Sequence, residues 1–419
     1  MRTLLKLFQK PRPAADRATL RASSPAEAAP ASGLLIVKYE MAAPAPAEAL
    51  LRLSVEGVAG PALEKPVTLG PDVQRAWLAL HGHLLPSGLV RVRLELVGAD
   101  GEQLAQREMT LRPRNEGAVA RAVAESLRAT GAPLVVDGCC DSTMYDYSDP
   151  ALAAWFDRSP EEAEEHIRGL ERSGAVTLAE AEALRRFVAE GYLVLPDVVD
   201  AGHLQRLNAA LDDAVAKKIE GYEWGASQRI HNLHNHYPAV RELWLHPTIM
   251  RMLSLIFGEP AKPCQSLTYV FGSEQQYHQD TIHLTPFPAG RMCGVWTALE
   301  DVAPDSGELI VYPGSHRERR VYMQDAGVAK VRNEDWTEFG EKVAPIWEGM
   351  LVNGGYRREV YRPKAGTVLI WHENLMHAGS VRQERSRSRR SIVGHYFAQS
   401  AIVYYDSSGM PGVVTEVAA

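Results

Sequence analysis

The sequence predicts a mainly β protein with flanking helices, and three observations lead to that fold class. Alternating apolar and charged residues, clearest in GLVRVRLELV at 88–97, indicate half-buried strands in the first third of the chain. Helical spacing dominates from about Ala118 to Val215. Beyond about Gln265, short apolar runs return between Gly, Pro and Asp turns, without the strand-helix alternation of a parallel doubly wound sheet. An antiparallel barrel or jelly roll is therefore expected there.

Length and composition indicate a globular protein of more than one domain. The 419 residues exceed the usual domain size, and contents of 46% hydrophobic and 23% charged residues are typical of soluble chains. A net charge of −7 argues against nucleic-acid binding by phosphate neutralisation. No apolar run reaches the ~18 residues of a membrane-spanning helix. The four cysteines suit a reduced, cytoplasmic protein better than a disulfide framework.

Four segments of the chain differ in composition and in the secondary structure that they predict. Residues 1–33 are expected to be a disordered tail and linker, because residues 11–33 are rich in Ala, Pro and Ser. Residues 34–115 carry alternating strands and predict a small antiparallel β-sandwich-like domain, with Asp100-Gly101 as a hairpin turn. Residues 116–176 predict a helical connector, and residues 177–419 predict the barrel domain.

Capping signals mark where the helices begin and end. Ser159 with Glu162, and Thr177 with Glu180, have the residue types and spacing of capping boxes. Gly131 is expected to end the helix that starts near Ala118.

The segment YHQD places His278 and Asp280 two residues apart at the end of a strand-like run. On an extended chain both side chains point the same way, so a nitrogen and a carboxylate oxygen can converge on one cation. A third ligand candidate, His377, follows the strand-like run GTVLIW, 99 positions after His278. Two histidines and one carboxylate leave positions open on an octahedral metal, which suits non-haem iron(II). The pattern H-x-D alone is common by chance, and a surface or structural role is its alternative.

Four stretches of sequence resemble a known family. They are FVAEGYLVLPDVV, YHQD, WTALEDVAPDSGELIVYPGSH, and GTVLIWHENLMHAGS followed by RSRRSIVGHYF. In this order, over roughly half of the chain, they resemble the phytanoyl-CoA dioxygenase family of iron(II)/2-oxoglutarate oxygenases. The resemblance implies a double-stranded β-helix, His278, Asp280 and His377 as metal ligands, and Fe(II), 2-oxoglutarate and O2 as cofactor and cosubstrates.

The resemblance also implies residues for the cosubstrate. The family binds the distal carboxylate of 2-oxoglutarate with an arginine about a dozen residues after its last histidine ligand. Arg389 follows His377 by twelve positions and is assigned this role, with Arg387 and Arg390 as alternatives. Trp296 matches an aromatic position near the cosubstrate in the family, although an ordinary core tryptophan is its alternative.

Other histidines have weaker signals. His372 is an alternative for the distal metal ligand, because it lies five residues before His377. His283 is expected to line the substrate pocket or to serve the structure. His234 and His236, in RIHNLHNHYP, are expected on a substrate-lining loop; a second metal site is disfavoured because no cysteine or carboxylate lies close to them in sequence.

These features predict a hydroxylating dioxygenase that acts on an unactivated carbon. The family's substrates imply a small or medium organic molecule of acyl, amino-acid, natural-product or sugar type. Related halogenases carry a small residue in place of Asp280, so the aspartate favours hydroxylation. A desaturase, epimerase or cyclising oxidase with the same site is the alternative, as is a non-catalytic barrel with a vestigial site.

The N-terminal strands stand apart from the metal motifs. We expect that domain to present a carrier-bound substrate or to mediate contact with a partner or a second copy. Packing on the catalytic domain for stability alone is the alternative.

Overall fold

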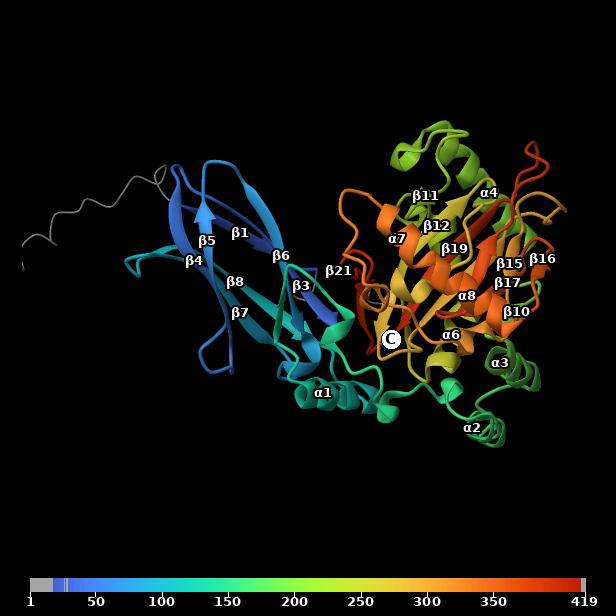
Figure 1. Cartoon of the computed structure of the whole chain (residues 1–419), viewed down its shortest axis with the longest axis horizontal. Coiled ribbons are helices and arrows are strands. Elements are labelled where there is room, and N and C mark those ends of the chain that lie inside the picture. The colour runs from blue at the N-terminus through green and yellow to red at the C-terminus, as the bar shows by residue number, and fades with distance from the viewer. Residues whose placement is uncertain (1–17, 26, 28, 416–419) are drawn as a thin grey trace, which may run out of the picture. The chain divides into compact units, whose positions relative to one another are not determined.

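The computed structural model describes residues 18–25, 27 and 29–415, in two compact units that span 1–139 and 140–419 (Figure 1). The first seventeen residues of the expected disordered tail lie outside the described residues. The rest of the expected linker differs from its prediction, because Thr19–Ser23 forms a strand, β1. Its backbone pairs in register with the edge of the next long strand, which satisfies groups that a linker would leave to water.

Two antiparallel sheets form the first unit, with a short parallel pairing of β2 and β8 at one edge. The first sheet has the order β1, β3 (Leu34–Ala42), β6 (Gln74–His81) and β9 (Val135–Asp137). The second has the order β2 (Pro30–Ala31), β8 (Gln103–Pro113), β7 (Val90–Gly98), β4 (Ala47–Val55) and β5 (Pro61–Leu69). Alternate residues of both sheets, among them Leu51, Leu80 and Val92, share one buried core.

Local signals in this unit match the structure. Along β7 the apolar residues are buried and Arg91 and Arg93 are exposed, and β7 pairs with β8 across a turn at Asp100-Gly101. Helix α1 (Ala118–Thr130) ends at Gly131, whose φ of 69° lies in the left-handed region.

The division between the units differs from the predicted segments. The first unit extends to Cys139, because β9 pairs with β6 and so returns the chain to the first sheet. The second half of the expected connector belongs to the second unit, where Phe156 and Ile167 are buried in its core. The predicted connector of 116–176 is therefore shared between the two units.

A six-stranded antiparallel sheet forms the centre of the second unit. Its order is β10 (Tyr192–Leu195), β17 (Val368–His372), β14 (Met292–Ala298), β19 (Ser391–Ala398), β12 (Ala261–Tyr269) and β11 (Ile230–His231). A second sheet has the order β16 (Glu359–Tyr361), β15 (Leu309–Val311) and β18 (His377–Gly379), and a third has β13 (Thr285–Phe287), β20 (Ile402–Tyr405) and β21 (Met410–Pro411). Many strands with flanking helices confirm the broad part of the predicted fold class, a mainly β protein with flanking helices.

Both faces of the central sheet are covered. Strands β14, β17 and β19 are buried along their whole length, so their sequences are almost continuously apolar. Successive side chains still alternate between faces: Val295 packs in the core that contains the helices, whereas Trp296 packs with Leu309 of the smaller sheet. The space between the central sheet and β15 is where the metal motif lies.

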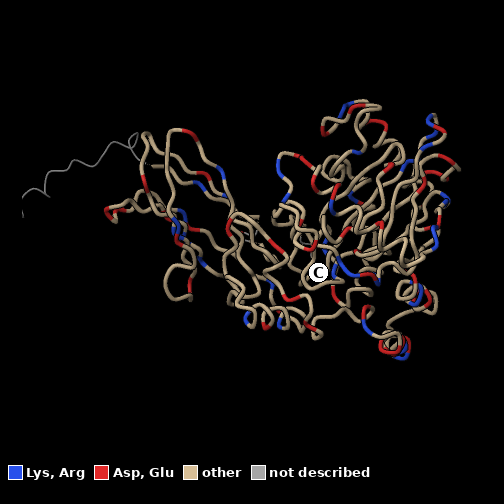
Figure 2. Tube along the Cα trace, viewed as in Figure 1, with Lys and Arg blue, Asp and Glu red and all other residues tan. Residues whose placement is uncertain are grey.

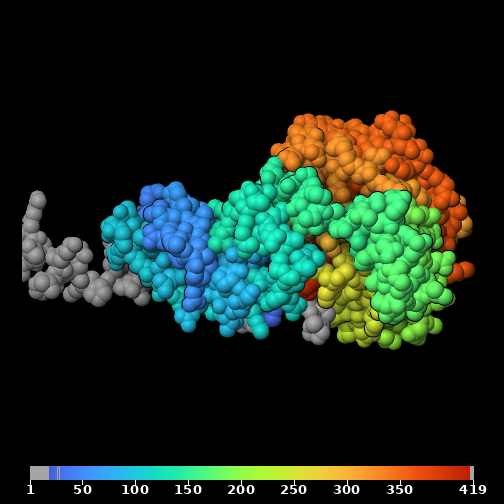
Figure 3. Space-filling model, turned by 90° about the horizontal axis from the view of Figure 1, so that it is seen from below, coloured from blue at the N-terminus to red at the C-terminus, as the bar shows by residue number. Residues whose placement is uncertain are grey.

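Seven helices are described in the second unit. They are α2 (Pro160–Arg172), α3 (Leu178–Glu190), α4 (Ala201–Ala216), α5 (Pro238–Trp244), α6 (Pro247–Phe257), α7 (Thr337–Lys342) and α8 (Ala344–Gly354). Both predicted capping boxes are present at the starts of α2 and α3. In the space-filling view of Figure 3, the green segment that contains α2 and α3 covers part of this unit's visible face.

Charged residues of both signs lie along the surface of each unit. Basic and acidic residues are both spread along the traced chain (Figure 2), and many form surface pairs such as Arg93 with Glu108. Within the described ranges, no helix combines the length and apolar character needed to cross a membrane.

The register of the central sheet leads to a stability prediction. Gly294 of β14 lies opposite Trp371 of β17, and a Cβ built on Gly294 would lie within 2.1 Å of the indole ring. We expect Gly294→Ala to lower the free energy of unfolding by roughly 1–3 kcal/mol, because the packed indole cannot move aside without strain. Denaturant unfolding measures the change.

Gly349→Ala is the matched control. Gly349 lies in α8, and no atom lies within 4 Å of the position that its Cβ would take. Alanine favours a helix over glycine by about 1 kcal/mol, so this variant should be unchanged or slightly more stable. Equal stability of the two variants would contradict the packing argument.

Candidate metal centre and its cavity

A two-way backbone bridge brings the distant metal motifs together. His278 N–H donates to the His377 carbonyl oxygen at 3.0 Å, and His377 N–H donates to the His278 carbonyl oxygen at 3.2 Å. His377 begins β18, while Asp280 begins a short 3-10 turn (Asp280–Ile282) immediately after the bridge. The 99-residue separation in sequence is thereby closed by one antiparallel pair.

The three side chains converge as the sequence predicts. One ligand atom from each of His278, Asp280 and His377 lies within 4.8 Å of the other two, and all three residues are buried. Asp280 Oδ1 lies 3.5 Å from His278 Nε2 and 3.8 Å from His377 Nε2. Among the described residues this is the single cluster of its kind.

Hydrogen bonds orient both imidazoles towards Asp280. His278 Nδ1 lies 2.8 Å from the Gln276 carbonyl oxygen, and His377 Nδ1 lies 3.0 Å from the Leu375 carbonyl oxygen. Because a carbonyl oxygen can only accept, each Nδ1 carries the proton and each Nε2 presents a lone pair. The side-chain amide nitrogen of Gln275 lies 3.2 Å from His278 Nε2. This tautomer is the one that metal-binding histidines need.

Electrostatics favour an ionised Asp280 beside a neutral His377. Burial alone would raise the pKa of Asp280, but the neighbouring His377, His278 and His395 outweigh it and hold the pKa well below its usual value. Burial, with His278 close by, lowers the pKa of His377 to about 4. The carboxylate also accepts a hydrogen bond on Oδ2 from Trp371 Nε1 at 2.8 Å. These are the protonation states in which Asp280 and His377 can bind a divalent cation.

Arg389 lies two residues before β19, and its guanidinium group is buried. Only 3% of the residue is exposed, and burial lowers its pKa to about 10. Nη1 donates to Ser391 Oγ at 3.0 Å, whereas Nε has no hydrogen-bond partner among the described residues. The guanidinium carbon lies 5.5 Å from the Trp296 ring centroid and 5.6 Å from that of Tyr269. No described carboxylate lies within ion-pair distance of this cation, so it is a buried positive charge without a partner.

The alternatives to Arg389 have different surroundings. Arg387 is exposed and donates to the Pro304 carbonyl oxygen at 2.8 Å. Arg390 forms an ion pair with Asp212 at 2.7 Å. Neither lines the cavity that contains Arg389 and the three candidate ligands.

The remaining predicted residues fall into two groups. Trp296 and His283 line the cavity, and His372 does not, since its imidazole lies 3.2 Å from Asp157 on the other side of β17. The structure corrects the expectation for His234 and His236, which do not line the cavity either. His234 is buried and stacked on Trp244 at 3.7 Å between ring centroids, and His236 is exposed and lies 2.6 Å from Glu220.

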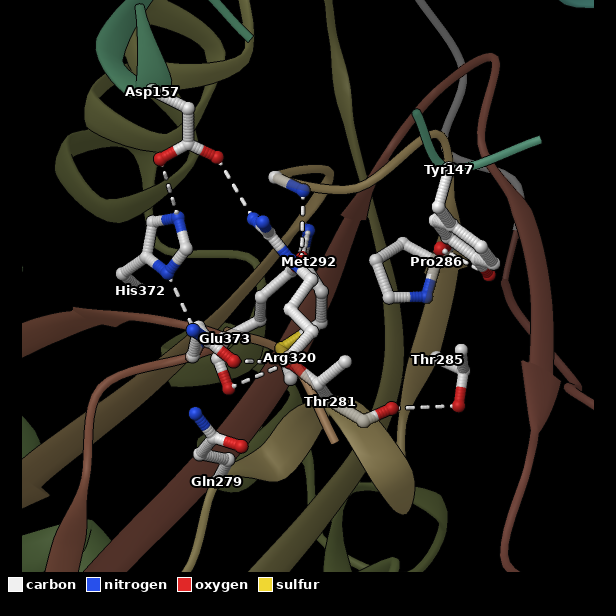
Figure 4. Close-up of polar contacts among 12 residues, drawn as sticks. Tyr147, Asp157, Gln279, Thr281, Thr285, Pro286, Met292, Arg320, His372 and Glu373 are labelled. Atoms are coloured by element: carbon white, nitrogen blue, oxygen red, sulfur yellow. Dashed lines mark hydrogen bonds and ion pairs between the residues drawn. The ribbon is translucent and has the colours of Figure 1, made fainter. Parts of the chain in front are cut away.

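An ion network around the buried carboxylate of Glu373 supports the metal motifs, and the sequence analysis did not predict it (Figure 4). Arg320 donates to Glu373 Oε1 at 2.9 Å and to Asp157 Oδ2 at 2.8 Å. The Glu373 carboxylate also accepts from the backbone N–H groups of Gly290 and Met292, at 2.8 and 3.1 Å. These residues come from four separate segments, so no local sequence pattern could have indicated the network.

Glu373 connects this network to the candidate ligands. Its carbonyl oxygen accepts from Thr281 N–H at 3.2 Å, and Thr281 follows Asp280 directly. Glu373 also lies four residues before His377. One buried residue therefore holds the segments of two candidate ligands in place.

The cavity over the three candidate ligands has a volume of about 630 Å³, within the usual range for small-molecule sites. His278, Asp280, His377 and Arg389 all line it. A wall of aromatic side chains from α7, α8 and the residue before α7 borders the same cavity: Trp336, Phe339 and Trp347. The arrangement offers a metal position, a buried cation and an apolar surface in one space.

Comparison with known proteins bears on this site. The model of the phytanoyl-CoA dioxygenase family matches residues 187–391, which contain all three candidate metal ligands and Arg389. Residues 187–391 belong to the phytanoyl-CoA dioxygenase family. The resemblance expected from the four sequence stretches is confirmed, and the six-stranded sheet described above belongs largely to this phytanoyl-CoA dioxygenase segment.

Individual relatives cover only parts of the chain. The mouse phytanoyl-CoA dioxygenase domain-containing protein 1 is 34% identical over 91 residues, which are 20% of this chain and 31% of that protein. Human peroxisomal phytanoyl-CoA dioxygenase is 20% identical over 256 residues, which are 54% of this chain and 70% of that protein. The chain thus matches about a third of the length of the mouse relative.

Two solved structures are similar in fold. The non-heme alpha ketoglutarate dependent carbocyclase SnoK from nogalamycin biosynthesis aligns with a TM-score of 0.45 and 21% identity, covering 57% of this chain and 94% of that one. EctD from S. alaskensis with bound Fe aligns with a TM-score of 0.42 and 20% identity, covering 53% of this chain and 77% of that one.

The network around Glu373 can be tested in the phytanoyl-CoA dioxygenase segment. Glu373→Gln removes the charge that pairs with Arg320 but keeps the size of the side chain. We expect the free energy of unfolding to fall by about 2–3 kcal/mol, because a buried charge-assisted pair is lost. Denaturant unfolding measures the stability. Titration with a divalent metal shows whether the three candidate ligands keep their arrangement.

Glu359→Gln is its matched control, because Glu359 pairs with Arg357 at the surface. Exposed pairs contribute less than about 1 kcal/mol, so this variant should unfold like the original protein. The support role of Glu373 is wrong if Glu373→Gln changes neither the unfolding free energy nor metal affinity.

Proposed function

We propose that this chain is an iron(II)- and 2-oxoglutarate-dependent dioxygenase that hydroxylates an unactivated carbon of a small or medium organic substrate. One observation carries the proposal: His278, Asp280 and His377 converge at one point of a cavity that also contains the guanidinium of Arg389, which has no acidic partner among the described residues. Membership of residues 187–391 in the phytanoyl-CoA dioxygenase family supports it.

The donor set fits a divalent iron ion. Two neutral imidazole nitrogens and one carboxylate oxygen face a common point, and their second nitrogens are held by backbone carbonyl groups. When bound, iron(II) with 2-oxoglutarate and dioxygen supplies the oxidation: one oxygen atom enters the substrate, and 2-oxoglutarate is converted to succinate and carbon dioxide. Iron, 2-oxoglutarate and dioxygen are also the cofactor and cosubstrates that the resemblance implies.

Arg389 fits the distal carboxylate of 2-oxoglutarate. A planar guanidinium group donates two parallel hydrogen bonds to a carboxylate, and it keeps its charge at neutral pH even with a pKa lowered to about 10. Its free Nε and its burial between Trp296 and Tyr269 leave an anion as the missing partner. The rings of these two residues fix the plane of the guanidinium and exclude water from it.

The other residues around the site orient groups and keep water out. Trp371 holds Asp280 by its Oδ2 and leaves Oδ1 facing the two histidines. The aromatic wall formed by Trp336, Phe339 and Trp347 covers part of the space in which a substrate would lie. A site of this kind restricts oxidation to the carbon held over the metal.

The same architecture bears on the alternatives. Related halogenases carry a small residue where this chain has Asp280, so the carboxylate favours hydroxylation over halogenation. A desaturase, epimerase or cyclising oxidase would use the same residues, and no described contact favours one of them. The central sheet facing the β16-β15-β18 sheet supports assignment of the barrel as a double-stranded β-helix. The role of the N-terminal unit stays a prediction.

Metal binding gives the first test of the function. We expect Asp280→Ala to weaken binding of iron(II), titrated without oxygen, by roughly 100-fold or more, because the sole carboxylate of the cluster is lost. Succinate formation from 2-oxoglutarate should fall with it.

Asp301→Ala is the control, since Asp301 is an exposed residue paired with Lys364 at the surface. It should bind iron(II) like the unaltered protein. Tight binding of iron(II) by Asp280→Ala would contradict the proposed function. So would a failure of the unaltered protein to form succinate with iron(II), either with a candidate substrate or in the uncoupled reaction without one.

Arg389 gives a second, independent test. Arg389→Gln should weaken binding of 2-oxoglutarate to the metal-loaded protein roughly 10- to 100-fold, as expected for loss of a charge-assisted hydrogen-bonded pair. Metal affinity without 2-oxoglutarate should stay the same. Calorimetric titration measures both affinities.

The chain supplies two matched controls within three residues. Arg387→Gln and Arg390→Gln remove the same charge at positions that do not line the cavity. Both should bind 2-oxoglutarate within about twofold of the unaltered protein. If either loses more affinity than Arg389→Gln, the assignment of Arg389 is wrong.

A further inference from the structure

Aromatic side chains are concentrated at the cavity. Four of the eight tryptophans in the chain line it, namely Trp296, Trp336, Trp347 and Trp371. Trp296 and Trp371 contact Arg389 and Asp280, so the proposed catalytic groups account for them. Trp336 and Trp347 contact neither of these groups and need another explanation.

Trp336, Phe339 and Trp347 form one continuous aromatic wall. Phe339 lies between the other two, with ring centroids 5.3 Å from Trp336 and 5.8 Å from Trp347. Phe339 and Trp347 are buried, whereas Trp336 is 44% exposed although it is a large apolar side chain. An apolar ring left open at a cavity indicates a surface that a ligand covers.

The wall has a fixed position relative to the metal motif. Trp347 Nε1 donates to Gln279 Oε1 at 3.0 Å, and Gln279 lies between His278 and Asp280 in sequence. The ring centroids of Trp347 and His278 are 6.4 Å apart. A molecule that stacks on this wall therefore has its atoms beside the proposed metal position.

A second arginine lines the cavity at another point. Arg229 Nη1 lies 3.3 Å from the hydroxyl of Tyr269, whose ring is also near Arg389. No described carboxylate lies within ion-pair distance of Arg229, and Asp280 is the single acidic residue among those that line the cavity. The two arginines of this cavity thus have no acidic side chain to pair with.

The charges of the proposed site do not cancel without a further anion. Arg229, Arg389 and a divalent iron ion carry four positive charges. Asp280 and the dianionic 2-oxoglutarate carry three negative charges, and Arg389 is assigned to 2-oxoglutarate. One positive charge remains, and it lies on Arg229. A low-dielectric cavity favours a ligand that neutralises it.

We propose that the substrate is a ring-bearing apolar molecule with a single anionic group. Its ring system lies on the wall of Trp336, Phe339 and Trp347, and its anionic group pairs with Arg229. This inference deepens the proposed function and rests on it, because the charge balance includes iron and 2-oxoglutarate. Flat indole and phenyl faces match flat rings better than flexible aliphatic chains, and a guanidinium group matches a planar or tetrahedral oxyanion.

Two fluorescent probes of the same shape separate the two halves of the inference. The probe 8-anilinonaphthalene-1-sulfonate carries the ring system and one anionic group, whereas N-phenyl-1-naphthylamine carries the rings alone. Both are titrated into the full chain loaded with Mn(II) and 2-oxoglutarate, and fluorescence reports binding. We expect the sulfonate to bind more tightly than the amine.

Two substitutions then assign the contacts. Arg229→Gln should weaken binding of the sulfonate about tenfold, which corresponds to one charge-assisted contact, and leave the amine unchanged. Trp336→Ala should weaken both probes several-fold, and its partly exposed position makes folding of the variant safe. Arg241→Gln and Trp224→Ala are controls, because both residues are exposed and neither lines the cavity.

Each remaining outcome counts against the inference. Equal losses for both probes in Arg229→Gln, or no loss for either, would refute the anion contact, and unchanged binding in Trp336→Ala would refute the wall. If Arg229→Gln weakens 2-oxoglutarate binding as much as Arg389→Gln does, Arg229 belongs to the cosubstrate and the inference fails. The titrations are repeated without metal and 2-oxoglutarate. They show whether the protein still binds the sulfonate more tightly than the amine if the proposed function itself has failed.

Discussion

The site depends on the register of β14 between β17 and β19. This pairing sets Trp296 on the face towards the smaller sheet and Val295 on the face towards the helices. It also places Gly294 opposite Trp371, where the absent side chain leaves room for the indole that bonds Asp280. A shift of β14 by one residue would exchange its two faces, so that Trp296 would turn away from the cavity and Gly294 would no longer lie opposite Trp371.

The arginines Arg320 and Arg389 show how the fold separates support from binding. Arg320 is fully paired, because Glu373 and Asp157 each accept a hydrogen bond from it. Arg389 has no acidic partner and is still buried. Burying an unpaired charge is costly, so its retention is explained most simply by a ligand that completes the pair. Arg229 also lacks an acidic partner among the described residues, at a less buried position of the same cavity.

Local sequence was enough for the elements whose signals lie within a few residues. Alternation identified β7, and capping boxes identified the starts of α2 and α3. The spacing in YHQD predicted that the side chains of His278 and Asp280 converge, and they do, although Asp280 begins a 3-10 turn and does not continue an extended chain. The segment around His234 and His236 misled, because polar residues near an active site resemble polar residues of any loop until their neighbours are known.

The resemblance to the family and the three candidate ligands came from the amino-acid sequence, and the resemblance implied Arg389, with Arg387 and Arg390 as alternatives. Tertiary structure alone decided which arginine is buried without a partner, which histidines turn away from the cavity, and how Arg320, Asp157 and Glu373 meet behind the metal motif. It also decided that Arg229 and the wall of Trp336, Phe339 and Trp347 border one space. Burial and unsatisfied charge are properties of neighbours in space, and the residues concerned are far apart in the chain.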